Sequence, residues 1–394
     1  MINLKTYLKN ETVMTTQKYK MCTRCVMDTT DPEISFDSEG VCNHCHTFDS
    51  ETSKRWFPNE EGKVKLQEMF DQIKHERKNF EYDCVLGLSG GLDSSYLALI
   101  MKEYDMRPLV VHVDAGWNSE TAVYNIEKIV KYCGYDLHTR VMSWPEIRDL
   151  QLAYLKAGVA NQDVVQDHAF FASLYHFAVE NKIDYVISGG NIATEAVFPK
   201  KWHHAAMDAI NLKAIHKRFG KLPLKDYKTI SFLEYYLYYP FIKKMKAVRP
   251  LNYMPYSKEV ALQELVEKVG YKPYARKHGE SRFTKFFQNH YLPVKFNMDK
   301  RKPHLSSMIL SGLITRDRAL DELNKPLYDE TELREDKHFI SKKLGISVEQ
   351  LDGYVNSPGH LYSEYANWDS RYTLMKGIQS FVSKVLGRNV KNYS

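Results

Sequence analysis

Short apolar runs alternate with amphipathic stretches through the first half of the chain. Four runs rich in Val, Leu and Ile have the length of buried strands, at residues 84–88, 108–113, 137–142 and 184–188. The stretches between them have helical periodicity, clearest at residues 92–104 and 121–132. Strands that alternate with helices form a parallel sheet covered on both faces, and ligands bind at the carboxyl ends of such strands. The pattern therefore predicts an α/β domain.

The pattern changes on both sides of this domain. Residues 1–20 are polar and without periodicity, whereas residues 62–80 have the spacing of an amphipathic helix. Beyond residue 200 the chain is rich in Tyr, Lys, Phe and His and contains helical runs, at residues 232–244, 257–269, 340–351 and 371–386. We divide the chain into four segments: an N-terminal arm (1–20), a cysteine-rich knuckle (21–60), the α/β domain (61–200) and a mainly helical region for substrate or partner binding (201–394).

Composition and charge narrow the class of protein. Hydrophobic residues make up 43% of the chain and charged residues 26%, the balance of an ordinary globular protein. The formal net charge of +6 permits an anionic substrate but falls short of a dedicated nucleic-acid binder. The most apolar stretch, at residues 231–242, is too short and too polar to cross a bilayer, and the N-terminus lacks the apolar core of a signal peptide. We expect a cytoplasmic protein with neither a membrane nor a nucleic acid as partner.

The first predicted strand runs through two glycines directly into a helix. Glycines let the backbone approach a ligand closely, and the helix N-terminus offers free N–H groups to an anion. Gly90 and Gly91 form the turn, and Ser89, Ser94 and Ser95 add hydroxyl donors for a phosphate. Asp93 is suited to holding a Mg²⁺ ion that bridges the phosphates. The Walker A lysine and the dinucleotide fingerprint are both missing, and the alternative is a plain strand-to-helix turn with an N-cap.

The fourth predicted strand also ends in two glycines, which would lie beside the first loop in a parallel sheet. The candidate residues are Gly189, Gly190, Asn191, Thr194 and Glu195. Asn191 and Thr194 are suited to binding ribose or phosphate, and Glu195 to binding Mg²⁺ or orienting a nucleophile. The alternative is again an ordinary turn and N-cap.

Four of the six cysteines form two close pairs. Sixteen residues separate the pair Cys22 and Cys25 from the pair Cys42 and Cys45, a spacing typical of tetrahedral four-cysteine zinc sites. Four protein ligands leave no open position, so we predict a structural Zn²⁺ ion. Unligated cysteines and a reactive pair for sulfur transfer are the alternatives. The other two cysteines, in a strand and near a helix end, are expected to be buried packing residues.

A dense basic and aromatic run follows, at residues 277–286. Arg282 and Lys285 are three residues apart and share a helix face, so they are placed to clamp a diphosphate or a carboxylate. Enzymes that transfer an adenylyl group need a cation against the charge that develops at the α-phosphate. The alternative interpretation of the run is a solvated helix face.

The segment Ser-Gly-Gly-Leu-Asp-Ser-Ser at residues 89–95 resembles the SGGxDS loop of the PP-loop ATP pyrophosphatases. That superfamily includes asparagine and GMP synthetases, tRNA-lysidine synthase and tRNA thiolases. The resemblance implies a PP-loop nucleotide-binding domain that cleaves ATP between the α- and β-phosphates. The residues that would hold the departing pyrophosphate are Ser89, Gly90, Gly91, Asp93, Ser94 and Ser95. The backbone near Val111–Val113, at the end of the second strand, would lie beside adenine, and Val113 and Asp114 are counted among the ATP-binding residues.

A narrower resemblance covers residues 21–317. The cysteine knuckle, both glycine loops and the segments 112–120 and 277–287 are together similar to the N-acetyl sugar amidotransferases of bacterial surface-polysaccharide synthesis, including lipopolysaccharide O-antigen. The resemblance implies an enzyme that converts the N-acetyl group of a nucleotide-activated sugar into an acetamidino group. It assigns substrate binding to Trp117, Asn118, Lys277, His278, Glu280 and Arg282. The chain departs from the family pattern at Gln166, where a threonine usually precedes Asp167 and His168.

The mechanism implied by the resemblance has two steps. The acetamido oxygen attacks the α-phosphorus of ATP and releases pyrophosphate, and ammonia then displaces AMP. Asp93, Glu195, Arg282 and Lys285 are the predicted catalytic residues, with Asp114 as a second candidate for metal binding or proton transfer. The resemblance also implies separate glutaminase and ammonia-channelling subunits, similar to the pair used in histidine biosynthesis. The sequence identifies neither the sugar nor its carrier nucleotide.

Two other functions remain open at the level of the sequence. One is a PP-loop tRNA-modifying enzyme of the thiolase or lysidine-synthase type, which the modest net charge and the lack of a spare CxxC pair disfavour. The other is a nucleotide-binding adaptor without catalysis, in which the cysteine knuckle is an interaction module.

Overall fold

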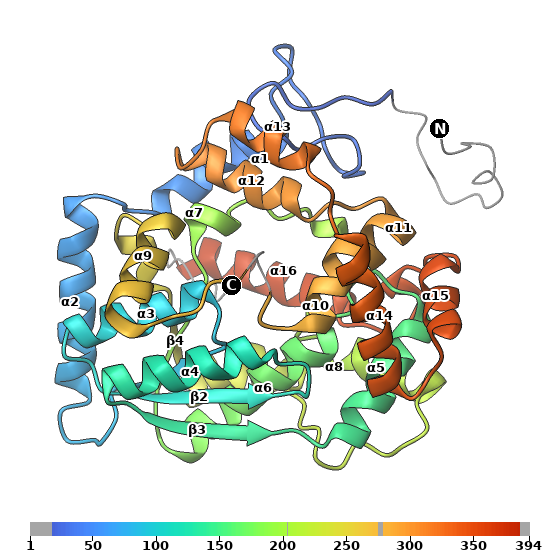
Figure 1. Ribbon diagram of the computed structural model, residues 1–394. Coiled ribbons are helices and arrows are strands. Elements are labelled where there is room, and N and C mark those ends of the chain that lie inside the picture. The colour runs from blue at the N-terminus through green and yellow to red at the C-terminus, as the bar shows by residue number, and fades with distance from the viewer. Residues whose placement is uncertain (1–17, 203, 275–278, 387–394) are drawn as a thin grey trace.

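The α/β part of the molecule is built on a five-stranded parallel sheet, of which β2, β3 and β4 are labelled in Figure 1. The computed structural model describes residues 18–202, 204–274 and 279–386. In these ranges the strands have the order β3-β2-β1-β4-β5, and every neighbouring pair is parallel. Their bounds are β1 Cys84–Gly87, β2 Pro108–Asp114, β3 Asp136–Val141, β4 Tyr185–Ile187 and β5 Lys246–Val248. The predicted α/β fold with a parallel sheet is confirmed.

The fifth strand was not predicted. It follows a π-helix, η4 (Glu234–Ile242), which contains Pro240 and corresponds to the predicted helical run at 232–244. Strand β5 pairs with β4 in the register Tyr185 to Lys246 and Ile187 to Val248. The sheet therefore extends into the region that the sequence pattern marked as mainly helical.

Alternating strand side chains belong to two hydrophobic clusters, one on each face of the sheet. On one face, Leu86 and Val110 pack with helices α2 (Glu60–Glu76), α3 (Leu92–Glu103), α4 (Glu120–Cys133) and α9 (Lys258–Val269). On the other face, Val85 and Val111 pack with helices α5 (Trp144–Ala157), α6 (Val164–Glu180) and α8 (Ala209–Phe219). This alternation is the period of two expected for strands buried on both faces.

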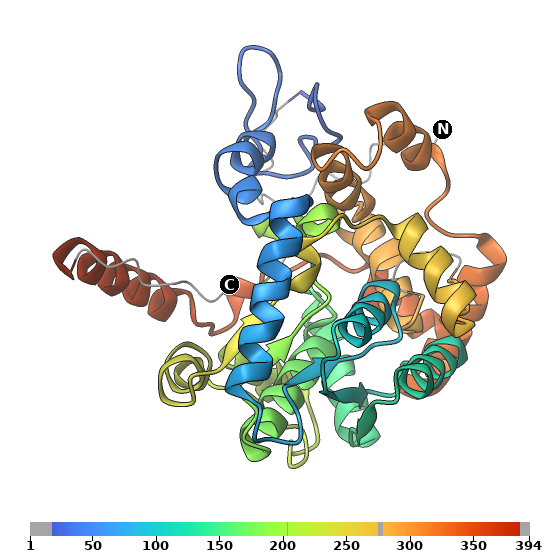
Figure 2. The ribbon, with the colours of Figure 1, turned by 90° about the vertical axis from the view of Figure 1, so that its left-hand side faces the viewer.

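The C-terminal part is mainly helical, as predicted. Its helices are α10 Arg282–Phe286, α11 Leu292–Phe296, α12 Arg301–Leu310, α13 Arg316–Asn324, α14 Glu330–Leu344, α15 Val348–Asn356 and α16 Asp369–Leu386. The predicted amphipathic unit at 340–351 is divided between α14 and α15, because Gly345 ends α14 in the left-handed conformation. Helix α16 extends away from the rest of the molecule (Figure 2).

The knuckle lies against helices α12 and α13, at the opposite end of the molecule from the β2–β3 edge of the sheet (Figure 1). Within the described ranges no helix is long and apolar enough to span a bilayer. The division of the chain into four segments stays a prediction.

Candidate functional site

The first glycine loop joins β1 to α3 and is held by its own hydroxyl groups. The hydroxyl of Ser89 accepts a hydrogen bond from the N–H of Gly91 at 3.2 Å, and the hydroxyl of Ser94 donates to the carbonyl of Gly91 at 3.3 Å. The hydroxyl of Ser95 is buried and has no hydrogen-bond partner in the described part of the chain. The loop thus combines hydroxyl groups with the N-terminus of α3, as the sequence predicts for a phosphate site.

Gly90 is the residue of this loop that must be glycine. Its φ is +79°, and a Cβ atom there would lie 2.7 Å from the backbone carbonyl of Ala122 in α4. Two distant tyrosines fix the same peptide, because the hydroxyls of Tyr271 and Tyr274 donate to the carbonyl of Gly90 at 3.1 and 3.0 Å. The loop is therefore held in one conformation before any ligand arrives.

Asp93, the acidic residue in the first turn of α3, is also oriented by a tyrosine. The hydroxyl of Tyr256 donates a hydrogen bond to Asp93 Oδ1. Burial, together with the negative charge of Asp93, raises the pKa of Tyr256 far above its usual value, so this hydroxyl keeps its proton. No sequence signal marked Tyr256, because it lies more than 160 residues from the loop that it supports.

The second glycine loop follows β4 and touches the first. A Cβ atom at Gly189 would lie 3.0 Å from the backbone carbon of Asp93 and 3.0 Å from the backbone nitrogen of Ser94. The short helix α7 (Ile192–Glu195) then begins at Asn191, whose side-chain oxygen accepts hydrogen bonds from the N–H and the hydroxyl of Thr194 at 3.0 and 3.1 Å. The side chain of Asn191 thus caps α7 and also accepts from the Thr194 hydroxyl, and the two loops meet at the carboxyl edge of the sheet.

The loop after β2 binds the segment that precedes α10. Asn118 and Ser281 form an antiparallel bridge, flanked by hydrogen bonds from Ser119 N–H to the Glu280 carbonyl at 2.8 Å and from Arg282 N–H to the Trp117 carbonyl at 3.2 Å. Four predicted substrate residues therefore lie together. The other two, Lys277 and His278, lie outside the described residues.

Within this group, the side chains of Trp117 and Asn118 already contact other residues of the protein. Trp117 is fully buried and packs against the rings of Trp144 and Phe283, with centroids 5.1 and 5.0 Å away. The side-chain nitrogen of Asn118 lies 2.9 Å from Nε2 of His112. At the end of β2, Asp114 accepts a hydrogen bond from the N–H of Gly116 at 2.7 Å, and Val113 is buried.

Arg282 and Lys285 both bind the same buried carboxylate. Asp336, in α14, lies 2.5 Å from Arg282 Nη2 and 2.6 Å from Lys285 Nζ, and it also accepts a hydrogen bond from the hydroxyl of Tyr328 at 2.6 Å. Glu332 lies 2.7 Å from the same lysine nitrogen. The two cations share a helix face as predicted, and that face meets α14.

Helices α6 and α10 are joined by a network around Gln166, the position at which the chain departs from the family pattern. Its side-chain oxygen accepts from the Ser281 hydroxyl at 3.1 Å, and its nitrogen donates to Asp163 at 3.2 Å. The hydroxyl of Thr284 also donates to Asp163, at 3.0 Å. Burial, and secondly the charge of Asp167, raise the pKa of Asp163 well above its usual range.

Asp167 differs from its neighbours because its side chain reaches solvent. Desolvation by the surrounding protein nevertheless raises the pKa of its carboxyl to about 6. No chemical pattern in the sequence singles out Asp163, and Asp167 entered the sequence analysis only as the residue after Gln166 in the family pattern.

Several of these contacts come from the last third of the chain, and that part has a recognisable family. Residues 280–379 match the family model described as "LPS biosynthesis protein WbpG-like, C-terminal domain". This WbpG-like segment contains Glu280, Arg282 and Lys285, together with helices α10 to α15. The resemblance to enzymes of surface-polysaccharide synthesis is therefore supported by an independent comparison.

Three solved structures are similar to larger parts of the chain. An NMN synthetase from Francisella tularensis is 14% identical with a TM-score of 0.35, over 71% of this chain and 94% of that one. The U34-tRNA thiolase NcsA from Methanococcus maripaludis, solved with its [4Fe-4S] cluster, is 14% identical with a TM-score of 0.34, over 82% and 89%. An NH3-dependent NAD synthetase from Campylobacter jejuni is 17% identical with a TM-score of 0.28, over 72% and 96%. The comparison with curated proteins gave no match.

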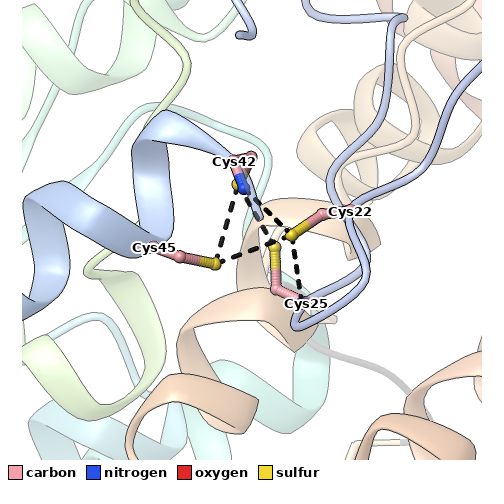
Figure 3. A group of neighbouring side chains, drawn as sticks. All are labelled: Cys22, Cys25, Cys42 and Cys45. Carbon is pink, nitrogen blue, oxygen red and sulfur yellow. Dashed lines mark hydrogen bonds between the residues drawn. The ribbon is translucent and has the colours of Figure 1, made fainter. Parts of the chain in front are cut away.

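The four knuckle cysteines converge on one point (Figure 3). Their sulfur atoms lie within 4.8 Å of one another, with separations of 3.8 Å for Cys22 and Cys45, 3.6 Å for Cys25 and Cys42, and 3.7 Å for Cys42 and Cys45. Four thiolates around one tetrahedral zinc ion have sulfur atoms about 3.8 Å apart. The cysteines therefore fit a single tetrahedral metal ion, as predicted.

Backbone N–H groups surround the same sulfur atoms. Cys22 Sγ accepts from the N–H groups of Arg24, Cys25 and Cys42 at 3.3–3.4 Å, and Cys25 Sγ accepts from Met27 at 3.5 Å. Such bonds disperse negative charge on metal-bound thiolates and orient the ligands. This is a second feature of the knuckle that fits a resident metal.

The WbpG-like segment connects the knuckle to the second glycine loop. On the knuckle side, Arg316 donates to the carbonyls of Cys22 and Cys25 at 3.0 and 3.1 Å, and Lys302 binds Asp28 at 2.5 Å. On the other side, helix α12 and Ser311, the residue that follows it, form three hydrogen bonds with α7 and the residues after α7. These are Ser311 Oγ to the Ala193 carbonyl (2.6 Å), Val197 N–H to Ser307 Oγ (2.9 Å) and His304 Nδ1 to the Thr194 carbonyl (3.0 Å). Helix α12 therefore couples the metal site to the loop that carries Glu195.

Proposed function

We propose that this chain is an ATP-dependent amidotransferase that adenylylates the N-acetyl group of a nucleotide-activated sugar and replaces its oxygen with ammonia. The product would be an acetamidino sugar for a bacterial surface polysaccharide, such as the O-antigen of lipopolysaccharide. The observation that carries the ATP chemistry is the contact between Gly189 and the backbone of Asp93 and Ser94, which joins two glycine loops at the carboxyl edge of one parallel sheet. The WbpG-like segment supports the assignment to polysaccharide synthesis.

The first loop suits the pyrophosphate part of ATP. The N-terminus of α3 provides N–H groups and a partial positive charge, and the serine hydroxyls at 89 and 94 provide further donors. Asp93 would hold Mg²⁺, and Glu195 or Asp114 would assist with metal binding or proton transfer. Glu195 Oε2 lies 3.6 Å from the position of a Cβ atom on Gly190, so its carboxylate is beside the second loop. When bound, Mg²⁺ would neutralise charge on the phosphates.

In the reaction that we propose, every bond formed is matched by a bond broken, and the excess proton has an acceptor. The acetamido oxygen forms a bond to the α-phosphorus, and the bond to the β-phosphate oxygen breaks to release pyrophosphate. Ammonia then adds to the former carbonyl carbon, AMP leaves with the original oxygen, and Glu195 or Asp114 takes the excess proton. The task of the protein is to position the reactants and to stabilise charge, which together account for large accelerations in enzymes.

Ammonia has to come from outside this chain in the proposed reaction. A glutaminase needs a reactive thiolate, and four of the six cysteines lie in the knuckle cluster. Cys84 and Cys133 are both buried, and burial raises the pKa of Cys84 well above its usual value and that of Cys133 to about 12. Neither is an activated nucleophile. We therefore propose separate glutaminase and ammonia-channelling subunits, in the cytoplasm.

We assign a structural Zn²⁺ ion to the knuckle, because four thiolates close a tetrahedral site. The sugar would bind near the bridge between residues 117–119 and 280–282, where the loop after β2 meets the WbpG-like segment. Charge on the Arg282 and Lys285 pair would act there in combination with Asp336.

The test is a substrate panel. The purified protein is incubated with Mg·ATP, an ammonium salt and UDP- or CMP-linked N-acetyl sugars, and AMP, pyrophosphate and the mass of each sugar are followed. The proposal expects AMP only with certain sugars, and expects those sugars to exchange oxygen for an imino group. Asp93→Ala should abolish the reaction, whereas Asp321→Ala, on the exposed side of α13, should not. AMP release with tRNA instead of a sugar would replace the proposal with a tRNA-modifying function.

A further inference from the structure

Arg249 directly follows β5, so it lies at the same edge of the sheet as the two glycine loops. The N–H of Ser188 donates to the carbonyl of Val248 at 2.9 Å, which extends the pairing of β4 and β5 to the residue before Arg249. The sequence pattern missed this residue because it missed β5.

The guanidinium group of Arg249 lies beside the second glycine loop. A Cβ atom on Gly190 would be 3.8 Å from Arg249 Nε and 3.6 Å from Glu195 Oε2. An arginine and a carboxylate therefore flank a residue that has no side chain. Such a pair can hold an anion on one side and a metal ion on the other, and the glycine leaves room for both.

Unlike the predicted cations, Arg249 is free. Its side chain is exposed, and its guanidinium group makes no hydrogen bond or ion pair with any residue in the ranges that the structure describes. Arg282 and Lys285, by contrast, share Asp336. An arginine that lies beside a ligand loop and has no counter-ion among the described residues is suited to bidentate binding of phosphate oxygens.

We propose that Arg249 binds the phosphates of ATP and holds the departing pyrophosphate. This inference rests on the proposed function, because it concerns the ATP of that reaction. Arg249 takes the role that the sequence assigned to Arg282 and Lys285, and it acts from the opposite end of the site. Arg249 follows β5, and β4 separates β5 from β1, which carries the first glycine loop. Phosphates that contact both Arg249 and the first loop would therefore lie across the two glycine loops rather than over the first loop alone.

The test compares binding of Mg·ATP, magnesium pyrophosphate and AMP to the wild-type protein, Arg249→Ala and Arg249→Lys by calorimetry. We expect the alanine variant to bind pyrophosphate and ATP about 10- to 100-fold more weakly, the range for loss of a hydrogen-bonded charge. The lysine variant should recover part of the affinity, because it keeps the charge but loses the bidentate fork. AMP binding should change less than threefold or so in both variants.

The matched control is Lys243→Ala, which removes an exposed cation at the end of η4 and should leave all three affinities unchanged. Thermal unfolding should be the same for all variants, because Arg249 is exposed. Wild-type affinity for pyrophosphate in Arg249→Ala would overturn the role of Arg249 while leaving ATP binding intact. A wild-type protein that binds neither ATP nor pyrophosphate would overturn the proposed function, and this inference with it.

Discussion

The hydroxyl of Tyr256 donates a hydrogen bond to the carboxylate of Asp93, across the junction of the two glycine loops. Tyr256 lies just before α9, in the region that the sequence assigned to substrate or partner binding. Tyr271 and Tyr274, on the other side of α9, bind the carbonyl of Gly90 in the same loop. The first glycine loop is thus built by two distant parts of the chain.

Tyr256→Phe should therefore slow the reaction without unfolding the protein. Asp93 would lose the bond that orients it, and a hydrogen bond to a charged group contributes about 1.5–3 kcal/mol, equivalent to about a tenfold or larger loss. We expect kcat for AMP formation to fall about tenfold and the Mg²⁺ requirement to rise. Tyr96→Phe is the control, because the ring of Tyr96 lies 5.9 Å from that of Tyr256 but its hydroxyl donates to Glu264 instead. An unchanged Mg²⁺ dependence would argue against this role.

Gly189→Ala tests the contact between the loops. The new methyl group would lie 3.0 Å from the backbone of Asp93 and Ser94, which cannot move as a side chain can. Overpacking of this kind costs about 1–3 kcal/mol, and here it would push the two loops apart. We expect ATP affinity, measured by calorimetry, to fall at least about tenfold. Gly353→Ala, where a Cβ meets open space in α15, should leave it unchanged.

Removal of the knuckle metal should increase the mobility of the second glycine loop. Cys42→Ser, or treatment with a chelator, would release the hairpin that Arg316 holds and so loosen α12. Hydrogen exchange should then accelerate in residues 193–197 and 303–311, and not in α2. Equal protection of residues 193–197 with and without metal would show that the knuckle is independent of the loop.

Asp336→Asn should destabilise the protein strongly. The substitution leaves Arg282 and Lys285 close together without their shared counter-ion, and breaking a buried ion pair costs about 3–5 kcal/mol. Urea unfolding should show a loss near the lower end of that range, because Arg282 is partly exposed. Asp321→Asn should have no measurable effect. A small loss for Asp336→Asn would mean that solvent screens the two cations.

The buried side chain of His168 should make the stability of the folded protein decrease at acid pH. Its Nδ1 lies 2.9 Å from the Ala206 carbonyl, and its Nε2 accepts a hydrogen bond from Ile230 N–H at 3.1 Å, which fixes the neutral ring. Burial lowers its pKa from 6.5 to about 4. The unfolded chain therefore gains a proton near pH 6.5 while the folded protein resists it. Stability should be complete above pH 6.5 and fall by up to about 3 kcal/mol as the pH approaches 4.

The check is urea unfolding across this pH range for wild type and His168→Gln. The variant should be less stable at pH 7 but should lose less on acidification. Parallel pH profiles would assign the acid sensitivity to other groups.

The sequence predicts those parts of the molecule in which local pattern and chemistry agree. The four strands and both glycine turns have short, self-contained signals, and the spacing of the cysteine pairs fixes their convergence. Strand β5 was not predicted from the sequence because it has three residues and follows a proline-containing π-helix. A strand so short is defined by its partner β4 rather than by its own periodicity.

Contacts between residues that are far apart in the sequence were not predicted either. The sequence shows that Arg282 and Lys285 share a face, but it cannot show that Asp336 is buried against that face. Likewise, no local pattern marks Tyr256 as the partner of Asp93, or Arg249 as a free cation beside Gly190. These relationships exist only after the C-terminal helices have packed against the sheet.

The antiparallel bridge between Asn118 and Ser281 limits how this protein can be recombined with its relatives. The WbpG-like segment begins at residue 280, and its first residues are hydrogen-bonded to the backbone after β2. A chimaera joined at residue 279 would divide this bridge between two parents, although the family boundary suggests a clean junction. To stay functional, an exchange of the C-terminal third must include residues 117–119 from the same parent. The part that has to be exchanged together is therefore longer than the segment that matches the family.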